Sequence, residues 1–146
     1  MAARDFFVQV RDDVARLAVV QAKLEAGGED WRPDSVRTGN GDPTAARAVY
    51  NLDTLAGKLE SLRSEERDLL ETIGRALAVI EGVRKGLGDE YASILDQRYI
   101  DGLPWRFVEY GGETVSPSTG KRKAAVAFDW IDSVGFAGVI AGKYEL

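Results

Sequence analysis

Three consecutive basic residues, Lys121, Arg122 and Lys123, are the side chains of this sequence whose type and spacing best suit a chemical role. They follow Ser116 and Pro117, a pair typical of a helix N-terminus, because serine caps a free N–H group and proline at the first helical position lacks one. Cations at such a position can bind phosphate groups and base edges in a DNA major groove. A run of charges on a helix is more often an ordinary solvated face, so both interpretations stay open.

Helical geometry divides the candidate DNA-contacting residues into two kinds. Ser118, Thr119 and Arg122 lie opposite the expected inner face near the helix N-terminus, so we expect them to contact base edges. The cations that flank this face, and one on the segment before the helix, suit phosphate groups. These phosphate-binding candidates are Lys121, Lys123 and Arg106.

The sequence contains few of the side chains that enzymes use for catalysis. It contains no histidine and no cysteine, which excludes thiolate and imidazole nucleophiles, zinc sites built on either ligand, and disulfides. It also lacks a glycine-rich phosphate loop, a nucleophile elbow and a spaced set of carboxylates. We therefore predict that the protein is not an enzyme and needs neither a cofactor nor a metal ion.

Charge limits how the chain could bind a polyanion. The net charge of -5 disfavours a general affinity for nucleic acid, because nonspecific binding depends on neutralising phosphates. Residues 103–133 carry four basic and four acidic side chains, so this segment is neutral and its affinity for DNA would be modest. Charged residues interrupt the apolar ones near the N-terminus, so we predict neither a signal peptide nor a membrane span, and a cytoplasmic location.

Two helices of unequal length are expected before the basic segment. The first has apolar residues at spacings of three or four from Phe7 to Leu24 and ends at Gly27. A surface loop, residues 27–43, leads to a second helix that has a long apolar seam and ends at Gly86. At 1.5 Å per residue the second helix would be about 60 Å long and the first about 35 Å. An antiparallel hairpin of the two therefore leaves part of the second helix uncovered.

The uncovered part of the second helix, from about Arg67 to Lys85, must pack on something else. Leu70 and Leu77 widen its apolar stripe, which favours contact with the C-terminal domain, with a second copy of the chain, or with both. Our hypothesis is a homodimer formed through this coiled-coil-like helical arm. The alternative is a monomeric hairpin whose apolar seam serves only as its own core.

A compact helical module is expected between residues 89 and 133. Asp89 caps a first helix that Gly102 closes, residues 105–110 form a short second helix, and a longer third helix follows Ser116. The expected inner residues are Tyr91, Ile94, Leu95, Tyr99, Trp105, Val108, Ala124, Ala127, Phe128 and Ile131. Three helices with short connections, of which the middle one is short, are typical of a helix-turn-helix. The fold class is thus predicted to be all-α.

The sequence therefore divides into three expected parts. Residues 1–88 form the helical arm, residues 89–133 the helix-turn-helix module, and residues 134–146 a tail. The tail is apolar, but glycine recurs in it at every third or fourth residue, which disfavours a helix there.

Two stretches of the module resemble region four of sigma factors, the domain that reads promoter DNA. RYIDGLPWRFV, residues 98–108, resembles its first half, and SPSTGKRKAAVAF, residues 116–128, resembles its recognition helix. The layout of arm, loop, long helix and module resembles the small phage and prophage regulators of the ArpU/RinA-like class. The resemblance implies a DNA-binding transcriptional regulator whose helix over about residues 117–133 enters the major groove of double-stranded DNA, with RNA polymerase as a further partner.

The sequence departs from the sigma-like pattern at two places. The stretch EYGGETV is about one residue longer than the usual turn and lacks its Leu-Gly pair, and Gly120 replaces an apolar anchor. Two other functions therefore stay open. One is a small-terminase-like DNA-packaging protein, which would form a ring of many subunits. The other is a helical oligomeric interaction protein with a degenerate helix-turn-helix.

Overall fold

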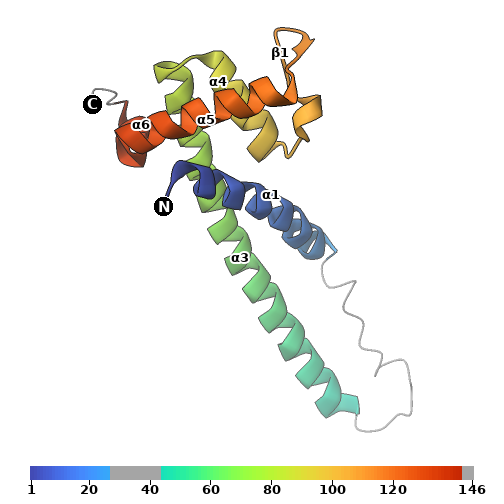
Figure 1. The fold of residues 1–146 in the computed structure, drawn as a ribbon. Helices are drawn as coiled ribbons and strands as arrows, with labels where there is room; N and C mark the ends of the chain where they lie inside the picture. The colour runs from blue at the N-terminus through green and yellow to red at the C-terminus, as the bar shows by residue number, and fades with distance from the viewer. Residues whose placement is uncertain (27–43, 143–146) are drawn as a thin grey trace. The chain divides into compact units, whose positions relative to one another are not determined.

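The computed structural model describes residues 1–26 and 44–142, with side chains from residue 54 onward in the second stretch. The chain is mostly helical, as predicted, and two short strands occur in the described part (Figure 1). The predicted loop over residues 27–43 lies outside the described residues, as does the end of the tail. Among the helices of the described stretches, none combines the length and the apolar character that crossing a bilayer requires.

Two long helices come first in the chain. α1 spans Ala3–Glu25 and α3 spans Thr44–Gly86, so α3 ends at the glycine predicted to end it. The N–H groups of Leu87 and Gly88 both donate to the carbonyl of Val83, and Gly88 has a φ of 133°. Side chains are strained at that angle, so glycine is what permits the sharp exit from the helix.

The chain divides into two compact units. Unit 1 consists of residues 1–15 and 70–146, and unit 2 of residues 16–69. In unit 2, Arg16 of α1 pairs with Glu65 of α3, with Nε–Oε2 and Nη2–Oε1 distances of 2.6 and 2.8 Å. Both side chains are well exposed, so this pair adds little to stability even though its geometry is bidentate.

The hydrophobic core of unit 1 combines segments from both ends of the chain. The ring of Phe7 in α1 stacks on Phe128 at a centroid distance of 5.6 Å and lies 5.7 Å from the ring of Tyr99. The last turns of α3 add Ala76, Val79, Ile80 and Val83 to the same cluster. The predicted contact between the second helix and the C-terminal segment is thereby confirmed. Leu70 and Leu77 stay outside this core, at 47% and 45% exposure.

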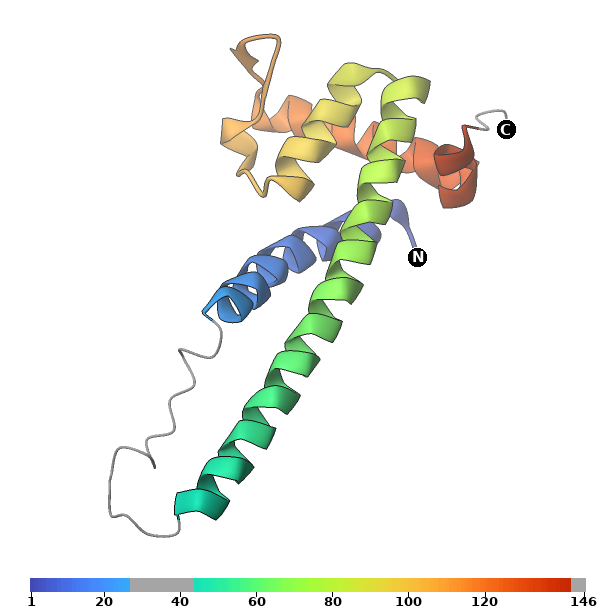
Figure 2. The same ribbon diagram turned by 180° about the vertical axis from the view of Figure 1, so that it is seen from behind.

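The first helix of the C-terminal segment begins directly after α3. α4, Asp89–Leu95, continues into a π-helical stretch, η1, Asp96–Ile100, and both lie beside the last turns of α3 (Figure 2). Three of the predicted inner residues, Ile94, Leu95 and Tyr99, are buried. Gly102, at φ 73°, follows the end of η1, as predicted from its position.

The segment between η1 and the next helix differs from the prediction. Trp105–Phe107 form a single 3-10 turn, η2, and the strands β1, Glu109–Tyr110, and β2, Glu113–Thr114, follow as an antiparallel hairpin (Figure 1). The short middle helix thus begins at Trp105 as predicted, but it is a single 3-10 turn that ends at Phe107, and the prediction that it extends to about Tyr110 is wrong. The reason is the pair Gly111 and Gly112, whose φ angles of 65° and 84° are the two positive angles that a tight hairpin turn requires and that glycine adopts without strain.

Two helices complete the chain. α5, Pro117–Val134, is the predicted third helix of the module, and Gly135, at φ 90°, separates it from α6, Phe136–Ala141. The expectation that the tail would disfavour a helix was wrong. Val139 of α6 is fully buried and packs directly on α3 at Gly82, so tertiary packing offsets the low helix propensity of the glycines.

Candidate nucleic-acid interface

The N-terminus of α5 has the structure that its Ser-Pro pair predicts. The Oγ of Ser116 accepts a hydrogen bond from the Thr119 N–H at 3.3 Å and donates one to the Thr119 Oγ1 at 2.8 Å. Pro117 occupies the first helical position, where its missing N–H costs nothing. The cap fixes the start of the helix and also engages the Thr119 hydroxyl, so Thr119 is less available to a base edge than the sequence predicted.

One face of α5 is exposed and carries half of the candidate residues. Ser118, Lys121 and Arg122 are exposed, and neither of the two cations forms an ion pair with a described carboxylate. The opposite face is buried and consists of Gly120, Ala124, Ala127, Phe128 and Ile131. Val126, at 44% exposure, lies four residues after Arg122 and therefore on the same face. Sequence reasoning missed Val126, although the spacing of four from Ser118 through Arg122 pointed to it.

Lys123 plays a different part from its two neighbours. Its ammonium group forms an ion pair with the carboxylate of Glu90 in α4 and lies 5.8 Å from the centroid of the Tyr91 ring. Its side chain is only 22% exposed. Lys123 therefore holds α5 against α4, and the prediction that it contacts phosphate is not favoured by this geometry.

Gly120 allows the indole of Trp105 to pack on the first turns of α5. A Cβ atom at position 120 would lie 3.1 and 3.2 Å from two ring carbons of Trp105, tighter than ordinary contact. An indole from η2 thus occupies the space that a side chain at position 120 would take. Gly120 is therefore the residue that lets η2 and α5 touch.

Arg106, the remaining candidate, projects from η2. It is exposed, and its guanidinium lies 4.9 Å from the ring centroid of Phe107. Phe107 is itself 53% exposed. Trp105, the neighbour of Arg106 in η2, packs on Gly120, so η2 lies against the first turns of α5.

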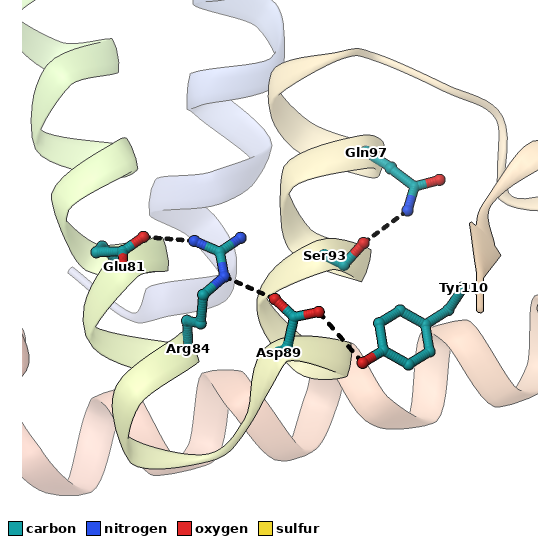
Figure 3. A network of polar contacts seen from close by, with 6 residues as sticks. All are labelled: Glu81, Arg84, Asp89, Ser93, Gln97 and Tyr110. Carbon is teal, nitrogen blue, oxygen red and sulfur yellow. Dashed lines mark hydrogen bonds and ion pairs between the residues drawn. The ribbon is translucent and has the colours of Figure 1, made fainter.

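A polar network attaches the hairpin to α3 and α4 (Figure 3). Arg84 donates to the Asp89 carboxylate at 2.8 Å, and the Tyr110 hydroxyl donates to the same carboxylate at 3.2 Å. These contacts, Asp89 above all, raise the pKa of Arg84 and that of Tyr110. Asp89 was predicted to cap α4. That prediction is wrong, because Gly88 holds the cap position and makes no side-chain cap bond.

Gln97 fastens the first strand of the hairpin to η1. Its side-chain amide donates to the Glu109 carbonyl at 2.7 Å and accepts from the Glu109 N–H at 2.9 Å, which is the pairing that another strand would provide. The same amide nitrogen donates to the Ser93 Oγ at 2.9 Å (Figure 3). The hairpin therefore has a fixed position ahead of α5.

Charges of both signs surround the exposed face of α5. The hairpin, which leads into α5, carries the exposed carboxylates of Glu109 and Glu113, and Asp129 is exposed about two turns beyond Arg122. The favourable surface for an anion is thus confined to the first two turns of the helix. These two turns present hydroxyl, ammonium, guanidinium and methyl groups, which suit the binding of an anionic ligand. No group of three or more His, Cys, Asp or Glu side chains that could hold a metal ion occurs in the described stretches.

Comparisons of the chain with protein-family models, with curated proteins and with solved structures found no match. Only the geometry and the charge of the described residues therefore bear on function.

Proposed function

We propose that the protein is a DNA-binding transcriptional regulator and that the first two turns of α5 enter the major groove of double-stranded DNA. Arg122 donates to a guanine edge, Ser118 contacts a neighbouring base, and Lys121 binds a phosphate. Val126 lies where it can contact a thymine methyl group. One observation carries the proposal: exposed Lys121 and Arg122 stand on a capped helix N-terminus without a carboxylate partner among the described residues.

The affinity of this surface alone would be modest. Two or three phosphate contacts correspond to a slope of about -2 to -3 when the logarithm of the binding constant is plotted against that of the salt concentration. The carboxylates of Glu109 and Glu113 oppose the attraction. Two copies of the chain on neighbouring half-sites would raise the affinity without new contacts.

We propose a homodimer formed through α3. Leu70 and Leu77 lie two turns apart on the same side of the helix and are nearly half exposed, although a large apolar side chain gains free energy from burial. Gly74, between them, has no atom within 4 Å of the position that a Cβ would take, so none of the described residues covers this part of the stripe. Light scattering tests the dimer, and a ring of many subunits would favour the small-terminase-like alternative instead.

RNA polymerase is the proposed protein partner, on the sigma-like resemblance of residues 98–108 and 116–128 alone. The same resemblance, with the lack of histidine and cysteine, supports a function without catalysis.

A second candidate is a helical interaction protein whose helix-turn-helix no longer binds DNA. One observation favours it: η2 and the hairpin occupy the place of the middle helix, which in a helix-turn-helix crosses the DNA backbone. Such a protein would form a helical oligomer and show no measurable affinity for duplex DNA.

Fluorescence anisotropy with short duplexes from the region upstream of the gene, over a range of salt concentrations, separates the two candidates. A guanine-reading arginine is worth about 1–3 kcal/mol, so Arg122→Ala should weaken binding to the preferred duplex by about 5- to 150-fold. Arg75→Ala, which removes an exposed arginine of α3, is the matched control and should bind as the wild type does. Absence of binding by the wild type at low salt would favour the second candidate.

A further inference from the structure

Two arginines lie side by side at the C-terminal end of η1. Arg11 of α1 donates from Nη2 to the carbonyl of Gly102 at 3.2 Å, and Arg98 of η1 donates from Nη1 to the carbonyl of Leu103 at 3.1 Å. Because these carbonyls belong to consecutive residues, the two guanidinium groups lie close together. We call Arg11 and Arg98 the arginine pair.

The arginine pair lacks a counter-ion. Neither side chain forms an ion pair with a carboxylate of the described residues. The C-terminal end of a helix supplies about half a negative charge, so about one and a half positive charges stay uncompensated. Burial and the charge of Arg11 together lower the pKa of Arg98. Cations that are withdrawn from water in proteins are normally paired.

The arginine pair also has unused hydrogen-bond donors. The Nε atoms of Arg11 and Arg98 are shielded from solvent and have no partner among the described residues, which costs free energy. Burial raises the pKa of Tyr99, and the charges of Arg98, Arg4 and Arg11 all oppose that rise. Arg4 itself lies 5.6 Å from the ring centroid of Phe128.

One indole ring separates the arginine pair from α5. The guanidinium of Arg98 lies 4.9 Å from the ring centroid of Trp105, and the same ring packs on Gly120 in the first turns of α5. The arginine pair and the first turns of α5 therefore contact the same indole ring. Guanidinium groups match the oxygens of a phosphate with their planar fork of donors.

We propose that the arginine pair binds a phosphate of a nucleic-acid backbone. This inference rests on the proposed DNA-binding function and deepens it. The exposed face of α5 would read the bases, and the arginine pair would fix the position of the protein on the duplex regardless of sequence.

The first test measures the melting temperature of the full-length protein in inorganic phosphate and in chloride, at equal ionic strength and pH. A ligand that binds the folded state raises the melting temperature. We expect phosphate to raise it for the wild type and for Arg75→Gln, which removes one exposed charge elsewhere in unit 1. Arg11→Gln should lose the rise, and Arg11→Lys, which keeps the charge but not the planar fork of donors, should retain part of it.

The second test measures binding to a duplex of random sequence over a range of salt concentrations. Loss of one phosphate contact makes the slope shallower by about 0.9, so Arg11→Gln should show this change and Arg75→Gln should not. Arg11→Gln should weaken binding to every sequence equally. Arg122→Ala should instead alter the preference among sequences.

Each result decides a different part of the proposal. A wild type without a phosphate-specific rise, or a rise that Arg11→Gln keeps, overturns the site. If the rise in melting temperature depends on Arg11 but the salt dependence of duplex binding does not, nucleic acid is not the ligand. The ligand is then a small phosphorylated molecule. If the salt dependence of duplex binding depends on Arg11, the phosphate site at the arginine pair is supported. If Arg122→Ala then leaves the preference among sequences unchanged, the role proposed for α5 is contradicted.

Discussion

Gly74 and Gly82 lie on the same helix, α3, and should respond in opposite directions to the same substitution. At Gly74 no atom lies within 4 Å of the position that a Cβ would take. Alanine there keeps the helix and lowers the entropy of the unfolded chain, so Gly74→Ala should stabilise the protein by about 0.4–1 kcal/mol. This substitution supplies the baseline for Gly82.

At Gly82 the added Cβ would meet α6. It would lie 2.5 Å from the Val139 Cγ1 and 3.0 Å from its carbonyl carbon, whereas carbon atoms pack at about 3.5–4.0 Å. α6 must then shift by about 1 Å or leave α3. Overpacking of this kind costs about 1–3 kcal/mol, and exposing the fully buried Val139 would cost a similar amount. Gly82→Ala should therefore be about 1–3 kcal/mol less stable than Gly74→Ala.

Urea unfolding followed by circular dichroism measures this difference. For a chain of this length, 1 kcal/mol corresponds to about 3 °C in melting temperature, so the two variants should melt about 3–9 °C apart. Amide exchange adds a local check, because the Val139 N–H, which donates to the carbonyl of Gly135, should exchange faster only in Gly82→Ala. If Gly82→Ala were as stabilising as Gly74→Ala, α6 would not dock on α3 at this position and the account of the tail would be refuted.

Substitutions at three further positions test local features of unit 1. Burial raises the pKa of Asp96, and the carboxylate of Asp101 raises it further. The protonated form of Asp96 therefore contributes stability to the fold below the unfolded-state pKa. This stability is lost as the pH rises through the folded-state pKa. Asp96→Asn should therefore stabilise the protein by less than about 1 kcal/mol at neutral pH and have no such effect at about pH 3; equal urea midpoint shifts at both pH values would contradict the assignment. Ser116→Ala should cost about 1 kcal/mol and speed amide exchange of Thr119, while Ser116→Asp keeps a cap; unchanged exchange in Ser116→Ala would show that the cap is not formed. Gly112→Ala should lower the melting temperature, because a side chain at a φ of 84° costs about 1–2 kcal/mol, and Gly112→Asn should lose less; a neutral alanine variant would argue against the hairpin turn.

The C-terminal end of α3 and the start of α5 could be predicted because their signals are local. A serine followed by proline caps a helix through its own oxygen, and a glycine ends one by adopting a positive φ, wherever the rest of the chain lies. The same local reasoning failed between η1 and α5. Gly111 and Gly112 suit a helix stop and a hairpin turn equally, and only the pairing of Gln97 with the backbone of Glu109 distinguishes the two.

The candidate site was predicted in part for the same reason. The exposure of Ser118 and Arg122 follows from the helical period, which places them opposite the buried Ala124 and Phe128. Lys123 belongs to the same basic run, yet its ammonium group pairs with Glu90, and the period of α5 contains no information about α4.

The sequence by itself determined that the protein is mostly helical, where α5 begins, and which of its faces is apolar, because caps, glycines and periodicity act within a few residues. The tertiary structure alone decided the contacts between distant segments. It joined Lys123 to a carboxylate 33 residues earlier, seated α6 on Gly82, and brought Arg11 to a carbonyl 91 residues further along the chain. Such contacts depend on how packed helices meet in space, and no spacing within a single helix specifies that.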